Sequence, residues 1–128
     1  MIFRSLLESL PFVKGNVLYV RIFVNRFHIR NVTSGKELDL PAEVPFSHPR
    51  TVIGEFTVAE LLLKQGVKSM GGFLPPRVLM HPMEKIEGGL TQIEERVFLE
   101  VAYGSGASKA AVWSGAQLRD EEVKAKVG

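Results

Sequence analysis

The pattern of hydrophobic and polar residues changes its period several times along the chain. Residues 2–10 (IFRSLLESL) fit a helix, because placing successive residues about 100° apart separates the apolar side chains from the polar ones. Pro11 ends this segment, since proline has no amide donor and clashes with the preceding turn. We therefore predict an amphipathic N-terminal segment over residues 1–11 and a single domain over residues 12–128. The apolar side of the segment consists of Ile2, Phe3, Leu6, Leu7 and Leu10.

Three strands are predicted after this segment. Residues 17–24 (VLYVRIFV) are almost all apolar, β-branched or aromatic, which is typical of a central strand covered on both faces. Residues 26–33 alternate, with Phe27 and Ile29 on one side of the strand. A turn at 34–36 precedes a third alternating run, which ends at Pro41. These spacings predict an antiparallel meander.

A helix is predicted after the proline-rich connection at 41–50. Thr57 and Glu60 have the spacing of a capping box, and Gly71 and Gly72 would end the helix. The expected apolar stripe consists of Val58, Leu61, Leu62 and Met70. Residues 77–81 (RVLMH) then predict a strand.

The second predicted helix begins at Thr91, which forms a capping box with Glu94. Its expected apolar face holds Ile93, Val97 and Val101, and glycines at 104 and 106 end it. A last strand at 109–114 and a short polar helix at 120–127 follow. The order βββαβαβα predicts an α/β fold with a mixed five-stranded sheet, parallel crossovers beside the meander and helices packed on the sheet.

Composition and charge agree with one globular domain. The chain has 128 residues, of which 45% are hydrophobic and 23% charged. It contains no cysteine, so disulfides and thiolate chemistry are excluded, and its net charge of +2 is too small to indicate nucleic-acid binding. No apolar run approaches the roughly 20 residues of a spanning helix, and a signal peptide is not recognisable. We expect a cytoplasmic protein.

Local motifs give little evidence for catalysis, a metal or a cofactor. GSGASK (104–109) has the glycines of a phosphate loop but lacks its ending and runs from helix to strand, the reverse of the working order. His28, His48 and His81 do not have zinc-ligand spacing, and no serine lies in a GxSxG elbow. We therefore predict no catalytic residue, metal or cofactor.

The apolar face of residues 2–10 needs a partner, because so short a helix is marginal alone in water. Three alternatives are its own sheet, a second copy of the chain and a membrane surface. Only Arg4, Lys14 and the amino terminus would attract anionic lipid, so membrane binding would be mainly hydrophobic.

Three segments together resemble the MreB family of bacterial actin-like rod-shape proteins: TVIGEFTVAELLLKQ, PPRVLMHP and GGLTQIEERVFLEVAYGSGASKAAVW. Members of that family have an acidic-aromatic-Val-[TA]-Glu helix, a Pro-Arg-Val strand, a Thr-Gln-x-Glu-Arg helix start and a Gly-Ala-Gly-Ala turn in this order. Residues 51–114 match these motifs, and residues 17–44 match by strand pattern alone. The resemblance implies subdomain IA of an actin-like fold, an RNase H-like sheet with strand order 3-2-1-4-5.

The departures from the family pattern decide the expected function. The family's first hairpin carries an Asp-x-Gly-Thr phosphate loop, but here it reads RIFVNRF, with Arg21 near the place of the acid and no glycine between Gly15 and Gly35. An arginine can contact phosphate but cannot hold magnesium. Most of the small subdomain after the third strand is missing, and the second phosphate loop has no counterpart. Glu94 matches the family's water-positioning glutamate. The resemblance thus implies a vestigial nucleotide site at Arg21, Asn25 and Glu94.

These observations predict a non-catalytic, MreB-like binding or structural module of the cell-shape cytoskeleton. Its expected partners are itself or a full-length MreB-like protein, with possible attachment to the inner face of the cell membrane through residues 2–10. One alternative is an actin-like ATPase half that binds ATP only with a partner chain, and another is a degenerate remnant. The loop HPMEKIEGG (81–89) is longer than the family's usual connection, which would suit a new contact.

Overall fold

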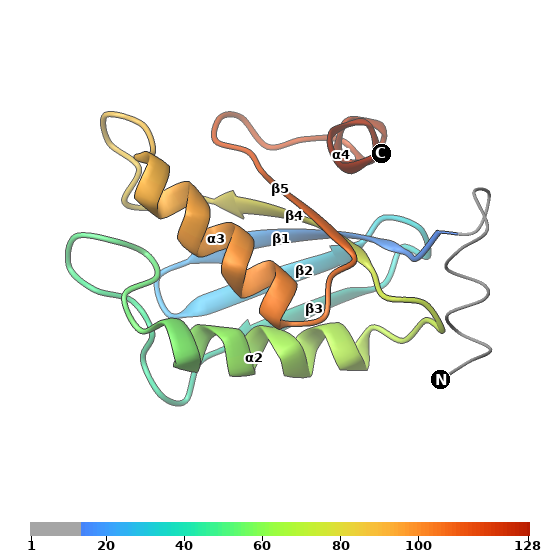
Figure 1. Cartoon of the computed structure of the whole chain (residues 1–128), viewed down its shortest axis with the longest axis horizontal. Coiled ribbons are helices and arrows are strands. Elements are labelled where there is room, and N and C mark those ends of the chain that lie inside the picture. Colours follow the sequence, from blue (N-terminus) through green and yellow to red (C-terminus); the bar gives the residue numbers. More distant parts are fainter. Residues whose placement is uncertain (1–13) are drawn as a thin grey trace.

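The computed structural model describes residues 14–128 and has an α/β fold with a five-stranded mixed sheet and, within these residues, three helices (Figure 1). The predicted order βββαβαβα is confirmed. The predicted apolar face of residues 2–10 lies outside the described residues. The strands are β1 (Val17–Phe23), β2 (Arg26–Asn31), β3 (Glu37–Pro41), β4 (Arg77–Pro82) and β5 (Lys109–Val112), and the helices are α2 (Phe56–Ser69), α3 (Gln92–Gly104) and α4 (Asp120–Val127).

The strands are arranged in the order β3-β2-β1-β4-β5. The pairs β1–β2 and β2–β3 are antiparallel, which confirms the meander, whereas β1–β4 and β4–β5 are parallel. Because β1 and β4 are parallel neighbours, the turn after β1 and the loop after β4 meet at the same end of the sheet. Figure 1 shows that α3 also begins toward this end.

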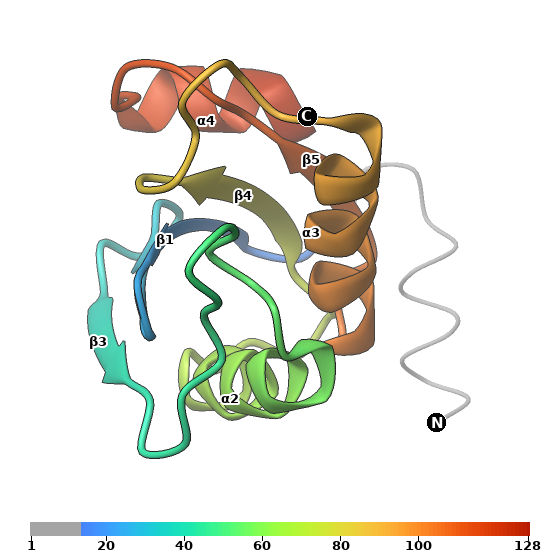
Figure 2. The ribbon, with the colours of Figure 1, turned by 90° about the vertical axis from the view of Figure 1, so that its left-hand side faces the viewer.

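Two apolar clusters explain why β1 is hydrophobic on both faces. Leu18, Val20 and Ile22 belong to the larger cluster, which α2 and α3 cover. The alternate residues Val17 and Tyr19 belong to a smaller cluster closed by α4. Figure 2 shows α2 and α4 on opposite sides of the sheet. The sheet is therefore the middle layer of the domain, and β1 lies at its centre.

The predicted start and apolar stripe of α2 are wrong in part. The helix begins at Phe56 with Glu55 as N-cap, and no side chain caps it, so Thr57 and Glu60 do not form a capping box. Leu61 is 56% exposed, because it lies two residues from the buried Leu63 and so points about 160° away from it around the helix. The fully buried positions are Ala59, Leu63 and Gly66.

Small residues set the buried face of α2. A Cβ atom added at Gly66 would lie 2.3 Å from the Leu40 Cδ1 atom and 2.6 Å from the Ile29 Cδ1 atom. The glycine therefore lets the helix approach β2 and β3 closely. The expected stripe was centred on large apolar residues, and the close approach at Gly66 moves the contact face toward Ala59 and Leu63.

The capping box of α3 is confirmed, and one residue of its predicted apolar face is wrong. Thr91 is the N-cap, and its hydroxyl oxygen accepts a hydrogen bond from the Glu94 amide. The buried residues are Phe98, Val101 and Ala102. Ile93 is 77% exposed, because it precedes Phe98 by five residues and thus lies about 140° from it around the helix.

Candidate functional site

The turn between β1 and β2 occupies the place where the MreB resemblance puts a phosphate loop. In such loops the backbone N–H groups point at the phosphate. Here both amides of the turn have side-chain acceptors from elsewhere in the chain. The Val24 N–H donates to a carboxylate oxygen of Glu84 at 2.6 Å, and the Asn25 N–H donates to the Ser47 hydroxyl oxygen at 2.9 Å.

Glu84 belongs to the long loop between β4 and α3. The same loop sends the Lys85 ammonium group to the Pro49 carbonyl oxygen at 3.1 Å. This loop, which is longer than the usual MreB connection, therefore contacts the β1–β2 turn through Glu84 and the connection before α2 through Lys85. A negatively charged carboxylate thus lies against the turn at which the MreB resemblance implies a phosphate loop.

Asn25 holds the β1–β2 turn against the connection that follows β3. Its backbone has φ of 52°, a left-handed conformation that asparagine tolerates better than most residues. Its side-chain oxygen accepts hydrogen bonds from the Phe46 and Ser47 amides at 2.9 and 2.8 Å, and its carbonyl oxygen accepts one from Ala42. These bonds give Asn25 a structural role.

Arg21 and Glu94 have local partners of their own. The Arg21 guanidinium donates to the Gln117 side-chain oxygen at 3.1 Å, on the face of the sheet that α4 covers. The Glu94 carboxylate accepts the Thr91 N–H at 2.9 Å as part of the capping box of α3. Within residues 14–128, no hydrogen bond or ion pair joins any two of Arg21, Asn25 and Glu94. Each of the three is held by a different part of the fold: Arg21 by Gln117, Asn25 by the connection after β3, and Glu94 by the start of α3.

These residues do not fit a magnesium–nucleotide group. Binding a triphosphate needs free amide donors and an acidic metal ligand with open coordination. The amides of Val24 and Asn25 are already bonded, to the Glu84 carboxylate and the Ser47 hydroxyl oxygen respectively. Among residues 14–128 there is also no group of three or more His, Asp or Glu residues placed to hold a metal ion.

A buried polar chain under α4 was missed by sequence reasoning. The Tyr19 hydroxyl lies 2.6 Å from His81 Nδ1, and the His81 Nε2 atom lies 3.0 Å from the Gly115 carbonyl oxygen. A carbonyl oxygen only accepts, so Nε2 carries the proton and Nδ1 accepts from Tyr19. The Tyr19 oxygen in turn accepts the Leu118 N–H at 3.2 Å. All four groups are satisfied when His81 is neutral.

Burial controls the titration of this pair. His81 is fully buried in β4, and desolvation lowers its pKa from the ordinary 6.5, although the hydrogen bond to Gly115 partly opposes the shift and the charge of Arg21 adds to it. Desolvation likewise raises the pKa of Tyr19. Both effects favour the neutral forms. The run RVLMHP is apolar and buried along most of its length, and nothing in it indicates that His81 contacts Tyr19, which lies 62 positions earlier in the sequence.

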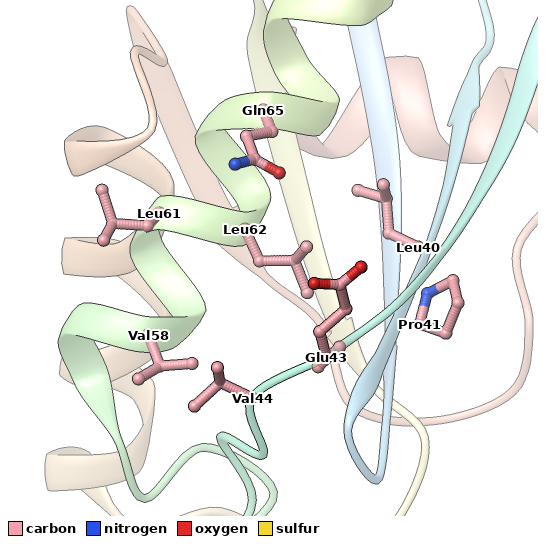
Figure 3. Close-up of a pocket in the computed structure, with 9 residues that line it drawn as sticks. Leu40, Pro41, Glu43, Val44, Val58, Leu61, Leu62 and Gln65 are labelled. Carbon is pink, nitrogen blue, oxygen red and sulfur yellow. The ribbon is translucent and has the colours of Figure 1, made fainter.

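An open groove runs between β3 and α2 (Figure 3). It has a volume of about 570 Å³. Figure 3 shows Val44 and Val58 close together at one end, with Gln65 on a later turn of α2. Among the described residues that line the groove, Glu43 is the one with a charge. The lining consists of Leu40, Pro41, Ala42, Glu43, Val44, Val58, Leu61, Leu62 and Gln65.

None of the helices within residues 14–128 combines the length and apolar character needed to cross a bilayer. The expectation of membrane attachment refers to residues 2–10, which lie outside this part of the chain.

Comparison with known proteins gives one informative relative. No family model matches the chain. The Escherichia coli (strain K12) protein named "Uncharacterized protein YjaA" is 33% identical to this chain over 103 residues, which cover 73% of this chain and 80% of YjaA. Identity at this level over most of both sequences establishes common descent and a shared fold. The chain belongs to the same family as YjaA.

Proposed function

We propose that this protein is a non-catalytic relative of MreB, with an RNase H-like sheet, that works as a binding or structural module of the bacterial cell-shape cytoskeleton. In this proposal it binds a full-length MreB-like protein or another copy of itself. Its apolar N-terminal face, residues 2–10, contacts that partner or the inner face of the cell membrane.

The topology of the sheet supports the RNase H-like part of the proposal. The MreB resemblance implies the strand order 3-2-1-4-5, and the observed order is β3-β2-β1-β4-β5 with β1, β4 and β5 parallel. Strand order is an independent observation, because the sequence motifs themselves say nothing about which strands are neighbours. Fold alone does not imply function, so the proposed role needs evidence from the site as well.

The bonding of the β1–β2 turn is the single observation that carries the non-catalytic part. Val24 and Asn25 offer the two amides that a phosphate would need, and Glu84 and Ser47 already accept from them. A phosphate entering here would have to displace a carboxylate and then remain beside its negative charge. Glu84 is exposed, so water and salt screen this repulsion, and it is worth at most about 1 kcal/mol in addition to the lost hydrogen bond. The turn is therefore suited to holding the fold together.

Binding to MreB-type filaments tests the proposed role. The full chain is mixed with polymerised full-length MreB-type protein from the same host, and filaments are pelleted by centrifugation. We expect the chain to pellet with filaments in a saturable manner and to stay in solution without them. Absence of the chain from the filament pellet at all concentrations would contradict the proposal.

A matched pair of variants locates the contact. Leu6→Glu with Leu7→Glu places two charges on the apolar side of the N-terminal segment, whereas Ser5→Glu with Ser9→Glu places the same two charges on its polar side. We expect the first variant to lose co-pelleting and the second to retain it. Equal co-pelleting of both would assign the contact to another surface.

A further inference from the structure

We propose that a pocket at the N-terminal ends of β1, β4 and β5 is a binding site for a small dicarboxylate. The pocket has a volume of about 390 Å³. Three of the residues that line it are cationic, namely Lys14, Arg77 and Lys109, and none of the lining residues is acidic. It lies at the end of the sheet opposite to the β1–β2 turn, so the inference does not depend on the proposed role with MreB.

Arg77 and Lys109 are direct neighbours on adjacent strands. They are paired in the register of the parallel strands β4 and β5, so both side chains project from the same face of the sheet, the face that α4 covers. Like charges at paired positions of neighbouring strands repel each other. Elsewhere on this face a cation has an acidic partner, as Arg30 has in Asp120 at 2.9 Å. The pocket offers no such acid, and an anionic ligand would supply the missing charge.

The guanidinium group of Arg77 is held in place with part of it free. Its Nε atom donates to the Gly15 carbonyl oxygen at 3.1 Å, which fixes the direction of the planar group. Within residues 14–128 its Nη1 and Nη2 atoms have no acceptor. Two N–H groups in this fixed fork match the two oxygens of a carboxylate, because both hydrogen bonds form in one plane.

Lys109 supplies the second free cation. Its side chain is exposed and has no hydrogen bond or ion pair in the described part of the chain. Lys14 differs, because its ammonium group donates to the carbonyl oxygen of Gly128, the C-cap of α4, at 3.1 Å. A cation at the carbonyl end of a helix is an ordinary structural contact. The pocket therefore presents two free cationic groups side by side.

These features favour two carboxylates over one phosphate. A phosphate loop offers converging backbone N–H groups. Here the Arg77 N–H already donates to the Asn16 carbonyl oxygen at 2.7 Å, and the Ser108 N–H donates to that of Pro76 at 2.8 Å. One bidentate pair and one exposed pair give an affinity on the order of millimolar. The pocket is thus too weak to retain a nucleotide at concentrations that fill an intact phosphate loop.

A titration of the full chain with succinate, followed by ¹⁵N–¹H correlation spectra at constant ionic strength, tests the site. Butyrate has the same carbon chain with one carboxylate, and inorganic phosphate carries its charge on a single group, so both are matched ligand controls. We expect saturable shifts of the Gly15, Ser108 and Lys109 amides with succinate. Both controls should bind roughly three-fold more weakly or worse, because each forms only one of the two ion pairs well.

Three variants locate the binding. We expect Arg77→Gln to weaken succinate binding roughly tenfold, since it removes the fork. Lys109→Gln changes an exposed side chain that the fold does not need, and we expect a loss of roughly three-fold. Arg50→Gln removes an exposed cation outside the pocket and should bind like wild type. The dispersion of each spectrum verifies folding.

Three results would overturn the proposal. The first is no saturable shift with succinate. The second is succinate binding that neither Arg77→Gln nor Lys109→Gln weakens relative to Arg50→Gln. The third is binding of butyrate or phosphate as tight as that of succinate, which would mean that the pocket attracts anions in general.

Discussion

Acidification is expected to destabilise the protein through His81. In the folded state the imidazole accepts from Tyr19 through Nδ1 and donates to the Gly115 carbonyl oxygen through Nε2, an arrangement that only the neutral ring satisfies. A protonated ring would present a second donor to the Tyr19 oxygen, which already accepts from the Leu118 amide. The charged groups near this pair are Arg21 on β1 and Glu122 on α4.

The size of the effect follows from proton linkage. The folded pKa of His81 is lowered below its ordinary value of 6.5, so in the window below 6.5 the unfolded chain binds a proton that the folded chain does not. Stability is therefore complete above pH 6.5 and falls as the pH drops from there toward the folded pKa. For each unit by which folding lowers this pKa, the complete loss is about 1.4 kcal/mol.

Urea unfolding at several pH values measures this loss. The chain contains a single tryptophan, Trp113, whose ring lies 3.9 Å from the Lys126 ammonium group of α4, so its fluorescence reports on the region around His81. A loss of 1.4 kcal/mol corresponds to a decrease in the urea midpoint of roughly 0.5 to 1 M. His81→Gln cannot titrate, and we expect it to lose far less stability over the same range. If the wild type and His81→Gln show the same dependence on pH, the assignment to His81 is wrong.

Three further predictions concern the caps, the packing and the N-terminal segment. Thr91→Ala removes the hydroxyl that caps α3, and we expect a loss of about 1 kcal/mol in the free energy of unfolding, with Thr91→Ser close to wild type in the same urea experiment. Gly15→Ala would place a methyl group 1.9 Å from the Pro75 carbonyl oxygen, so the backbone must move. We therefore expect the free energy of unfolding to fall by about 1 to 3 kcal/mol. A thermal midpoint equal to that of the wild type would refute this prediction. Leu6→Glu with Leu7→Glu should abolish any pelleting with liposomes, and pelleting equal to that of wild type would exclude the apolar face as the membrane contact.

The sequence predicts the order of elements well because the local signals are strong. The alternation after Arg26, the glycines at 71 and 72 and the capping box at Thr91 each have a physical cause within a few residues. The parallel pairing of β4 with β5 agrees with the single helix, α3, that joins them. These features depend little on distant contacts.

The buried faces of the helices and the geometry of the site depend on contacts between residues far apart in the sequence. The sequence predicts these features less well. The buried side of α2 is set by the close approach of Gly66 to Leu40, and a glycine carries no hydrophobic signal. The Tyr19–His81 contact joins residues 62 positions apart. Glu84 was recognisable only as part of a loop longer than expected, and its bond to the Val24 amide appears only in the folded chain.

The central claim is that Glu84 and Ser47 close the β1–β2 turn to a triphosphate. Titration calorimetry with ATP and magnesium tests this claim most directly. A full-length MreB-type protein with an intact phosphate loop is the positive control in the same buffer. For the present chain we predict no saturable heat of binding at nucleotide concentrations that saturate the control. Saturable binding with one nucleotide per chain would contradict the account and restore the actin-like ATPase as the leading function.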